Sequence, residues 1–361
     1  MSSAPQSQAA LAVAAEFVEP AAGLALGSTA AQLNWLEGVP ATLEVVLPYP
    51  LGRAVEALQV GLTAALAGVG APAVRVRTAI NSSAVQQNVQ PIQGIKNILV
   101  VASGKGGVGK STTAANLALA LASDGARVGL LDADIYGPSQ ARMMGLTGQR
   151  PSSSDGKTFQ PLDAHGVKVM SIGLLVDDEQ PMVWRGPMVT QALTQLLHDC
   201  RWGELDYLVV DMPPGTGDIQ LTLAQRVPVS GAVIVTTPQD IALLDARKGL
   251  KMFEKVNVPV LGIVENMSTH ICSNCGHEEH VFGAGGGARM AAQYGVDLLA
   301  ELPLHIDIRT QADEGRPTVV ADPAGALTQA YLSLARRTSA RLARHAAQAA
   351  RPMPKIEIDA S

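Results

Sequence analysis

Aromatic side chains are scarce in this sequence: phenylalanine, tryptophan and tyrosine together account for 3% of its 361 residues. A hydrophobic core must therefore be filled mainly by alanine, valine and leucine. Charged residues are also few, at 16%, whereas hydrophobic residues reach 47%. Disordered chains have the opposite balance, with low hydrophobicity and high charge, so this composition predicts a globular protein.

Cysteine is rarer still, with Cys200, Cys272 and Cys275 as the whole complement. An odd and low count argues against the disulfide framework of a secreted protein and favours a reducing compartment. The Ala-rich N-terminus is interrupted by Glu16 and Glu19 and has no basic segment, and the sequence holds no run of 18 apolar residues. We therefore expect a cytoplasmic protein without a signal peptide, a transit peptide or a membrane span.

An excess of positive charge is lacking too. The 27 lysines and arginines face 32 aspartates and glutamates, which gives a formal net charge of -5. Such a chain has no overall attraction for nucleic acid or for anionic membranes. We expect neither nucleic acid as a partner nor stable membrane association, although the terminal segment holds arginines at positions 336, 337, 341 and 344.

The pattern along the chain predicts two domains, in line with its length. Residues 1–83 hold a strand-like run at 41–47, a helical segment at 53–66 and a second strand at 73–79 in which valine and arginine alternate. Strand, helix and strand in so few residues predict a small α+β domain. The Asn- and Gln-containing residues 84–94 are expected to form a linker, residues 95–350 the main domain and residues 351–361 a tail.

From residue 95 onward, apolar runs of strand length alternate with helical segments. Near-continuous apolar strands with connecting helices are typical of the α/β class, in which helices cover both faces of a mostly parallel sheet. Ligands of such sheets bind beyond the carboxyl ends of the strands. The six expected strands are Ile98–Ala102, Val128–Asp132, Val167–Ser171, Tyr207–Asp211, Ala232–Thr236 and Val260–Val264.

A phosphate-binding loop follows the first of these strands and precedes a helix. Glycines in such a loop let backbone N–H groups approach phosphate oxygens, and the helix N-terminus favours an anion. Lys110 is predicted to neutralise the β- and γ-phosphates of ATP, and the Ser111 hydroxyl to ligate Mg²⁺. A glycine-rich surface turn is the alternative, but the strand before the loop and the helix after it argue against that. The expected nucleotide-binding residues are Gly104, Lys105, Gly106, Gly107, Val108, Gly109, Lys110, Ser111 and Thr112.

Aspartates end two further strands of the expected sheet. Asp132 and Asp134 follow the strand at 128–132, and Asp211 and Asp218 bracket the loop after the strand at 207–211. A carboxylate at a strand end beside a P-loop can hold Mg²⁺ through water, and we predict this role for Asp211. An aspartate there can equally cap a helix or shape a turn. For Asp132 and Asp218 both possibilities stay open.

The two neighbouring cysteines, Cys272 and Cys275, form a C-x-x-C motif outside any helix or strand pattern. In a cytosolic protein this spacing on a loop more often binds metal than forms a disulfide. A thioredoxin-like pair would need a helix N-terminus that the flanking residues do not support. A zinc site could recruit His277 and His280, but zinc motifs usually separate their ligand pairs by about a dozen residues. The third possibility is a cluster held by four thiolates, two from each of two subunits.

Several strings of the sequence together carry a family resemblance. The P-loop with its second lysine, Lys105, resembles the deviant Walker A ATPases, among them MinD, ParA, the nitrogenase iron protein and the Mrp/ApbC group. The match to the Mrp/ApbC iron–sulfur carrier family is close over roughly residues 95 to 345. The strings that support it are GKGGVGKST from 104, DIYGPS from 134, WRGPM from 184, DMPPGTGD from 211, and ENMS from 265 followed by the C-x-x-C-G-H string.

This resemblance implies a homodimer that sandwiches ATP, with Lys105 of each chain reaching the phosphates bound by its partner. It implies that Asp134 positions or activates the attacking water and that Asn266 contacts the adenine. Cys272 and Cys275 are implied to bridge a labile [4Fe–4S] cluster at the dimer interface. ATP-dependent transfer of that cluster to apo-proteins follows, with cluster-assembly scaffolds as further partners.

The N-terminal region is similar to the small iron–sulfur-assembly domain often fused ahead of this ATPase. No cysteine precedes Cys200, so any cysteine-dependent activity of that domain is absent here. Cys200 itself is expected to be a buried apolar thiol. The glycine run at 283–287 is expected to make the loop after the cysteines mobile, and His277 and His280 are expected to be solvated.

The strongest rival function is a positioning ATPase like MinD or ParA that binds membrane or DNA, since a basic amphipathic helix can lie on anionic lipid. The terminal segment is instead expected to be a packed helix with solvated arginines, because Leu327, Tyr331 and Leu334 are spaced to dock on the sheet. A nitrogenase-like reductase would bridge its cluster with separated single cysteines. A metabolic kinase would leave Lys105 and the cysteine pair without a purpose.

Overall fold

A computed structural model of the chain describes residues 4–70, 72–86, 89–175, 186–272 and 274–349. The first two residues of the WRGPM string, Trp184 and Arg185, lie outside these ranges, as does the expected tail at 351–361. In the described ranges no helix is long and apolar enough to cross a membrane.

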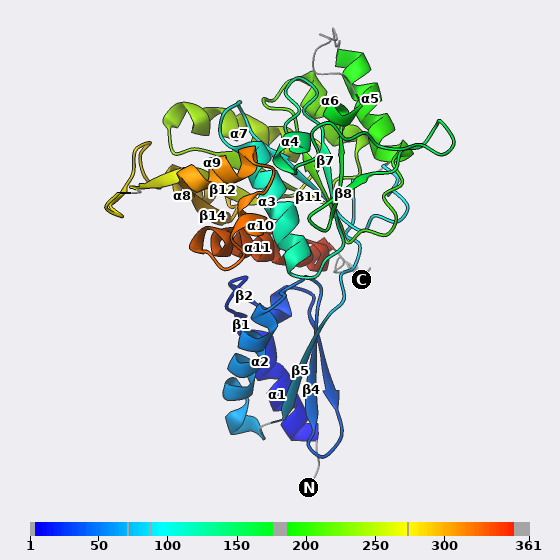
Figure 1. Cartoon of the computed structure of the whole chain (residues 1–361). Coiled ribbons are helices and arrows are strands. Elements are labelled where there is room, and N and C mark those ends of the chain that lie inside the picture. The colour runs from blue at the N-terminus through cyan, green and yellow to red at the C-terminus, as the bar shows by residue number, and fades with distance from the viewer. Residues whose placement is uncertain (1–3, 71, 87–88, 176–185, 273, 350–361) are drawn as a thin grey trace, which may run out of the picture.

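Nine strands of the described residues form the main sheet (Figure 1). Their order is β13-β12-β11-β6-β10-β7-β9-β8, with β14 also paired to β12. All pairs are parallel except β12 with β13 and β8 with β9, so the predicted, mostly parallel sheet is confirmed. The strands are β6 (Ile98–Ala102), β7 (Val128–Asp132), β8 (Leu162–Ala164), β9 (Val167–Ser171), β10 (Tyr207–Asp211), β11 (Gly231–Thr236), β12 (Val260–Ile271), β13 (Glu278–Glu279) and β14 (Leu298–Leu304).

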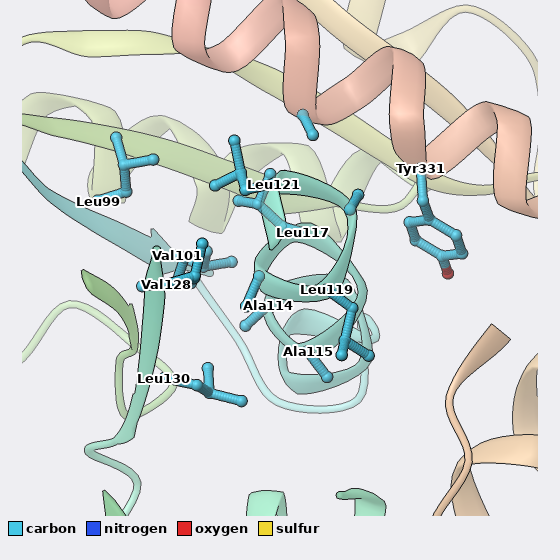
Figure 2. Close-up of a cluster of buried hydrophobic side chains, with 14 of the residues drawn as sticks. Leu99, Val101, Ala114, Ala115, Leu117, Leu119, Leu121, Val128, Leu130 and Tyr331 are labelled. Carbon is cyan, nitrogen blue, oxygen red and sulfur yellow. The ribbon is translucent and has the colours of Figure 1, made fainter. Parts of the chain in front are cut away.

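Helices cover both faces of this sheet because successive side chains of a strand point to opposite faces. Leu99 and Val101 of β6 pack toward α3 (Lys110–Ser123) and α11 (Ala326–Ala349), as Figure 2 shows. Ile98 and Val100 join the core on the other face. The helices of that second face are α5 (Gly186–Asp199), α6 (Asp218–Arg226), α7 (Asp240–Lys255) and α8 (Gly286–Tyr294).

Short helices complete the main domain. They are α4 (Gln140–Met143), α9 (Ile306–Asp313), α10 (Thr318–Ala321) and the 3-10 turn η3 (Ile172–Leu174). The strand at 260 is longer than predicted: it continues to Ile271 and turns back through β13. The sequence interpretation also missed β14, which lies beside β12.

The N-terminal region has its own sheet, in the order β3-β4-β5, so the predicted α+β unit is confirmed as a separate layer. Val74 and Val76 face its core while Arg75 and Arg77 are exposed, as their alternation predicts. The boundaries at 83 and 94 stay a prediction. The elements are α1 (Ala4–Glu16), β1 (Val18–Glu19), β2 (Leu24–Ala25), η1 (Leu26–Ser28), β3 (Gln32–Leu36), β4 (Thr42–Leu47), α2 (Ala54–Ala65), η2 (Ala67–Val69) and β5 (Ala73–Thr78).

The terminal helix α11 lies between the two regions (red, above the blue N-terminal part in Figure 1). Tyr331 is buried against the main sheet, as expected, whereas Ala340 and Ala343 belong to the N-terminal core. The expectation of solvated arginines is wrong. Arg336 forms two hydrogen bonds to Asp124, at 2.7 and 2.8 Å.

Two further arginines of α11 also have carboxylate partners. Arg341 donates to the Ala22 carbonyl of the N-terminal region and pairs with Asp297, and Arg344 reaches the same carboxylate at 2.6 Å. These partners come from distant parts of the chain, which helical periodicity alone does not reveal. These arginines of α11 therefore form internal ion pairs and a hydrogen bond to the N-terminal region, and they do not form a free basic surface.

Candidate functional site

The phosphate loop begins where β6 ends and finishes at the first residue of α3. Gly107 and Gly109 have φ values of 81° and 80°, a backbone conformation that glycine adopts without strain. Gly104 has a different reason to be glycine. A Cβ on it would lie 2.6 Å from the Ala246 backbone nitrogen and closer still to the Asp245 carbonyl, so α7 leaves no room for a side chain. The loop is thus pressed against the second helix layer.

Lys110 points into a buried group of oxygen atoms at the carboxyl edge of the sheet. Its Nζ donates to Asp211 Oδ1 and lies 3.2 Å from Ser111 Oγ and 3.9 Å from Asp134 Oδ2. Asp211 is completely buried and Lys110 is 5% exposed. Burial raises the pKa of Asp134, although the nearby Lys110 ammonium opposes the shift. The structure therefore brings together four of the residues singled out in the sequence.

This group suits a hard divalent cation. A hydroxyl, Ser111, and a carboxylate, Asp211, converge on one ammonium, and oxygen donors of these two kinds are those that Mg²⁺ takes beside phosphates. In their present positions both oxygen groups accept a hydrogen bond from Lys110. The donor set and its position next to the phosphate loop fit the expected metal.

Asp132 makes the loop-shaping contacts that one of its two open alternatives describes. Its carboxylate accepts hydrogen bonds from the backbone of Asp134, Ser139 and Gln140 and from the Ser171 hydroxyl, at 3.0 to 3.1 Å. Burial and the neighbouring Asp211 charge raise its pKa. These bonds hold the loop that carries Asp134.

Asp218 is the first residue of α6, and within the described ranges it forms no hydrogen bond or ion pair with the phosphate-loop residues. Asp218 is exposed in the first turn of α6, where the helix dipole stabilises a negative charge. It also lines a cavity of about 770 Å³ between α5 and α6. Lys105, in contrast, lies within the phosphate loop and is half-buried. Within the described part of the chain its ammonium has no ion-pair partner, and its role stays a prediction.

Asn266 connects the phosphate loop to β12. Its Nδ2 donates to the Val108 carbonyl at 2.8 Å and leaves no space for a side chain on Gly109. Beside it lies a cavity of about 350 Å³, and of its walls the sequence interpretation had assigned only Gly109, Thr112 and Asn266 to the nucleotide site. The sequence offered one sign of the remaining walls: Pro303 and Leu304 stand at the carboxyl end of β14, a strand that the sequence interpretation did not recognise. The lining residues are Gly109, Thr112, Met143, Asn266, Met267, Pro303, Leu304, His305, Ile308, Arg309, Ala312, Asp313 and Tyr331.

The cysteine pair lies at the tip of the β12–β13 hairpin, which projects from the sheet (yellow in Figure 1). Cys272 is half-buried and Cys275 is exposed, and neither forms a disulfide. Backbone N–H groups of Asn274 and Cys275 lower the pKa of the Cys272 thiol, which favours the thiolate that binds metal.

The histidines of this hairpin do not converge on the cysteines. His277 is exposed, and the Nδ1 of the exposed His280 lies 2.9 Å from the Ser268 carbonyl. Across the described ranges, no three histidine, cysteine, aspartate or glutamate side chains are grouped to hold a metal ion. Within the described part of one chain, the two thiols are therefore the only ligands that this hairpin offers to a metal or cluster.

The interpretation of the glycine run after the cysteines needs correction. Gly286 and Gly287 are buried in the first turn of α8, where Leu243 and Glu265 crowd them, so the expected loop is a helix there.

Gln140, at the phosphate site, was not singled out in the sequence at all. Its amide Nε2 donates to Asp211 Oδ2 and to the Ser111 carbonyl, both at 2.9 Å, and its only signal in the sequence was its position directly after DIYGPS.

Known proteins resemble this chain over most of its length. A protein from Pseudomonas fragi named iron-sulfur cluster carrier protein is 63% identical over 271 residues, which is 75% of this chain and 94% of that protein. The mouse iron-sulfur cluster transfer protein NUBPL is 53% identical, over 74% of this chain and 83% of its own length.

Solved structures also resemble this chain. A nucleotide-binding protein from Archaeoglobus fulgidus, in complex with ADP and with cobalt, is 38% identical with a TM-score of 0.57, over 65% of this chain and 91% of that one. The cell division ATPase MinD from Pyrococcus furiosus, at 22% identity and a TM-score of 0.51 over 67% of this chain and 97% of its own, supports the fold alone. The family model ParA, described as NUBPL iron-transfer P-loop NTPase, matches residues 94–339. The chain therefore belongs to this family of iron-transfer P-loop NTPases.

Proposed function

We propose that this protein is an ATP-dependent iron–sulfur cluster carrier that binds a labile [4Fe–4S] cluster as cargo between two copies of the chain. It hydrolyses ATP and passes the cluster to apo-proteins, and it receives it from cluster-assembly scaffolds. One observation carries the proposal: β12 contacts the phosphate loop through Asn266 and ends at Ile271, the residue before Cys272, so one strand connects the nucleotide site to the thiols.

Two chains are needed because four thiolates are the usual complement of a [4Fe–4S] cluster. Cys272 and Cys275 supply two from each copy. Lys105, which has no ion-pair partner in the described ranges, then serves the phosphates bound by the partner copy. We place this activity in the cytoplasm, where a reducing environment keeps both thiols free.

The residues of the phosphate site have separate tasks in this proposal. Backbone N–H groups of residues 104–109 and the Lys110 ammonium bind the phosphates, while Ser111 and Asp211 hold Mg²⁺, which neutralises charge on the phosphates when bound. Asp134 is buried beside Lys110 and orients the attacking water. The cavity next to Asn266 accepts the adenine.

Anaerobic reconstitution with iron and sulfide tests the carrier function. Visible absorbance and native mass are expected to report a brown dimer with about four irons per two chains, following the four-thiolate rule. Cys272→Ala and Cys275→Ala should each lose the cluster while nucleotide binding persists.

Cys200→Ala is the matched control, because this third thiol is buried and its pKa is raised to about 12 by burial. It should keep the cluster. A colourless protein holding zinc or no metal would contradict the carrier function and move a MinD- or ParA-like positioning ATPase to the front. Iron retained by Cys272→Ala would exclude the bridging site.

A further inference from the structure

Gln140 occupies an unusual position at the edge of the phosphate site. It is the first residue of α4 and is fully buried. Its Nε2 bridges the Ser111 carbonyl and Asp211 Oδ2, at 2.9 Å each. Its Oε1 is equally enclosed, yet this oxygen has no hydrogen-bond partner in the described part of the protein.

The orientation of this amide is determined by its neighbours. The Ser111 carbonyl and the Asp211 carboxylate are both acceptors, so only the NH₂ end of the amide can face them. The backbone of Gln140 is also held, because its N–H donates to Asp132 Oδ2 at 3.0 Å. The side chain therefore starts from a fixed backbone, and the unpartnered atom is its oxygen.

A buried acceptor without a donor is costly, and native proteins rarely keep one unless another molecule satisfies it. The two partners of Gln140 are the residues assigned above to Mg²⁺. That ion keeps several of its water molecules when it binds with phosphates, and each such water is a hydrogen-bond donor. Gln140 thus donates hydrogen bonds to the residues that would bind the metal, and its Oε1 remains available next to them as an acceptor.

We infer that Gln140 is a positioning residue for the magnesium–nucleotide complex. Its NH₂ group fixes the orientation of Asp211 and of the first turn of α3, and its Oε1 accepts a hydrogen bond from water of the hydrated divalent cation. This inference rests on the proposed nucleotide site. It is independent of the cluster.

The test uses the full chain with Gln140→Met, which keeps the side-chain volume and removes both polar atoms. Gln86→Met is the matched control, because the Gln86 amide is also bonded to carbonyls, those of Ala224 and Val227, but belongs to the linker. ADP binding is measured by calorimetry in EDTA and across a series of Mg²⁺ concentrations. Binding of Mn²⁺ to the ADP-loaded chain is followed by electron paramagnetic resonance.

Gln140→Met should raise the Mg²⁺ and Mn²⁺ concentrations for half-saturation about tenfold, since groups that orient metal ligands usually contribute at least that much to affinity. Its ADP affinity in EDTA should stay within about twofold of the original chain, as should every value for Gln86→Met. If Gln140→Met is poorly folded, Gln140→Asn, whose shorter amide cannot reach both partners, should shift the metal dependence in the same direction.

Three results would overturn the inference. One is an unchanged metal dependence in a folded Gln140 variant. Another is an equal loss of ADP affinity with and without metal, which would mean that the amide only supports the loop. The third is an original chain whose ADP affinity is the same with and without Mg²⁺, and this result alone would also overturn the Mg²⁺ site proposed at Ser111 and Asp211.

Discussion

Two glycines of the phosphate loop make a matched pair for testing how closely the loop is packed. Gly104 faces the backbone of α7, where a Cβ would lie 2.6 Å from the Ala246 nitrogen. Gly106 is two residues away, and a Cβ there would meet nothing within 4 Å. Neither glycine has a positive φ, so the same substitution at the two positions differs mainly in the space available.

The expected cost of Gly104→Ala follows from that distance. Carbon and nitrogen atoms in contact lie about 3.5 Å apart or more, so the loop or α7 must move by roughly 1 Å. The helix cannot yield easily, because Ala246, Leu250 and Phe253 anchor it in the core. Overpacking of this kind costs about 1–3 kcal/mol in the free energy of unfolding. Gly106→Ala should be neutral or stabilise by up to about 1 kcal/mol, because alanine restricts the unfolded chain.

Urea unfolding of the nucleotide-free chain measures both free energies, and ATP hydrolysis measures the functional effect. A displacement of about 1 Å in the phosphate loop should lower the hydrolysis rate of Gly104→Ala on the order of 100-fold. Equal unfolding midpoints for the two variants would refute the argument from packing. So would full activity of Gly104→Ala.

Three further predictions concern charges. Asp124→Asn should lower the free energy of unfolding by about 3 kcal/mol, because it leaves the mostly buried Arg336 guanidinium without its carboxylate. A loss below about 1 kcal/mol in urea unfolding would contradict this. Although burial alone would raise the pKa of Asp206, hydrogen bonds led by those from Arg127 lower it to about 2. Its stabilising effect is therefore present above the ordinary pKa of 3.8 and is lost as pH falls through about 2. Asp206→Asn should cost about 2 kcal/mol at pH 7 and progressively less below pH 4, and a difference that stays constant with pH would count against the ion pair. Lys105→Ala should keep the circular dichroism spectrum and the monomer stability but lose ATP hydrolysis, and near-normal hydrolysis would remove the argument for a lysine shared across the dimer.

The strand cores and the phosphate loop were predictable because they depend on local pattern. The run at 98–102 is apolar at every position, and its residues are all buried between two helix layers. Glycine, lysine and serine at P-loop spacing between a strand and a helix identify the loop without tertiary information. The weakly patterned α1 and the short strands at the edges were missed, since little in their sequence distinguishes them from loops.

The contacts that complete the site were beyond such reasoning. Lys110 meets Asp211 across 101 residues of sequence, and Gln140 meets the same carboxylate across 71. Their separation says nothing about distance until the sheet order brings β6 and β10 together. The same holds for Arg336 and Asp124, whose pairing turned an expected solvated surface into a buried contact.

The sequence by itself determined the kind of chemistry: a phosphate loop, carboxylates after strands and a pair of thiols, each recognisable because a short stretch of chain carries it. Only the tertiary structure decided which carboxylate faces Lys110, why Gly104 admits no side chain, and that β12, which contacts the phosphate loop, ends directly before Cys272. The physical reason is that local pattern reports how a segment is buried, whereas the choice of partner depends on how distant segments pack.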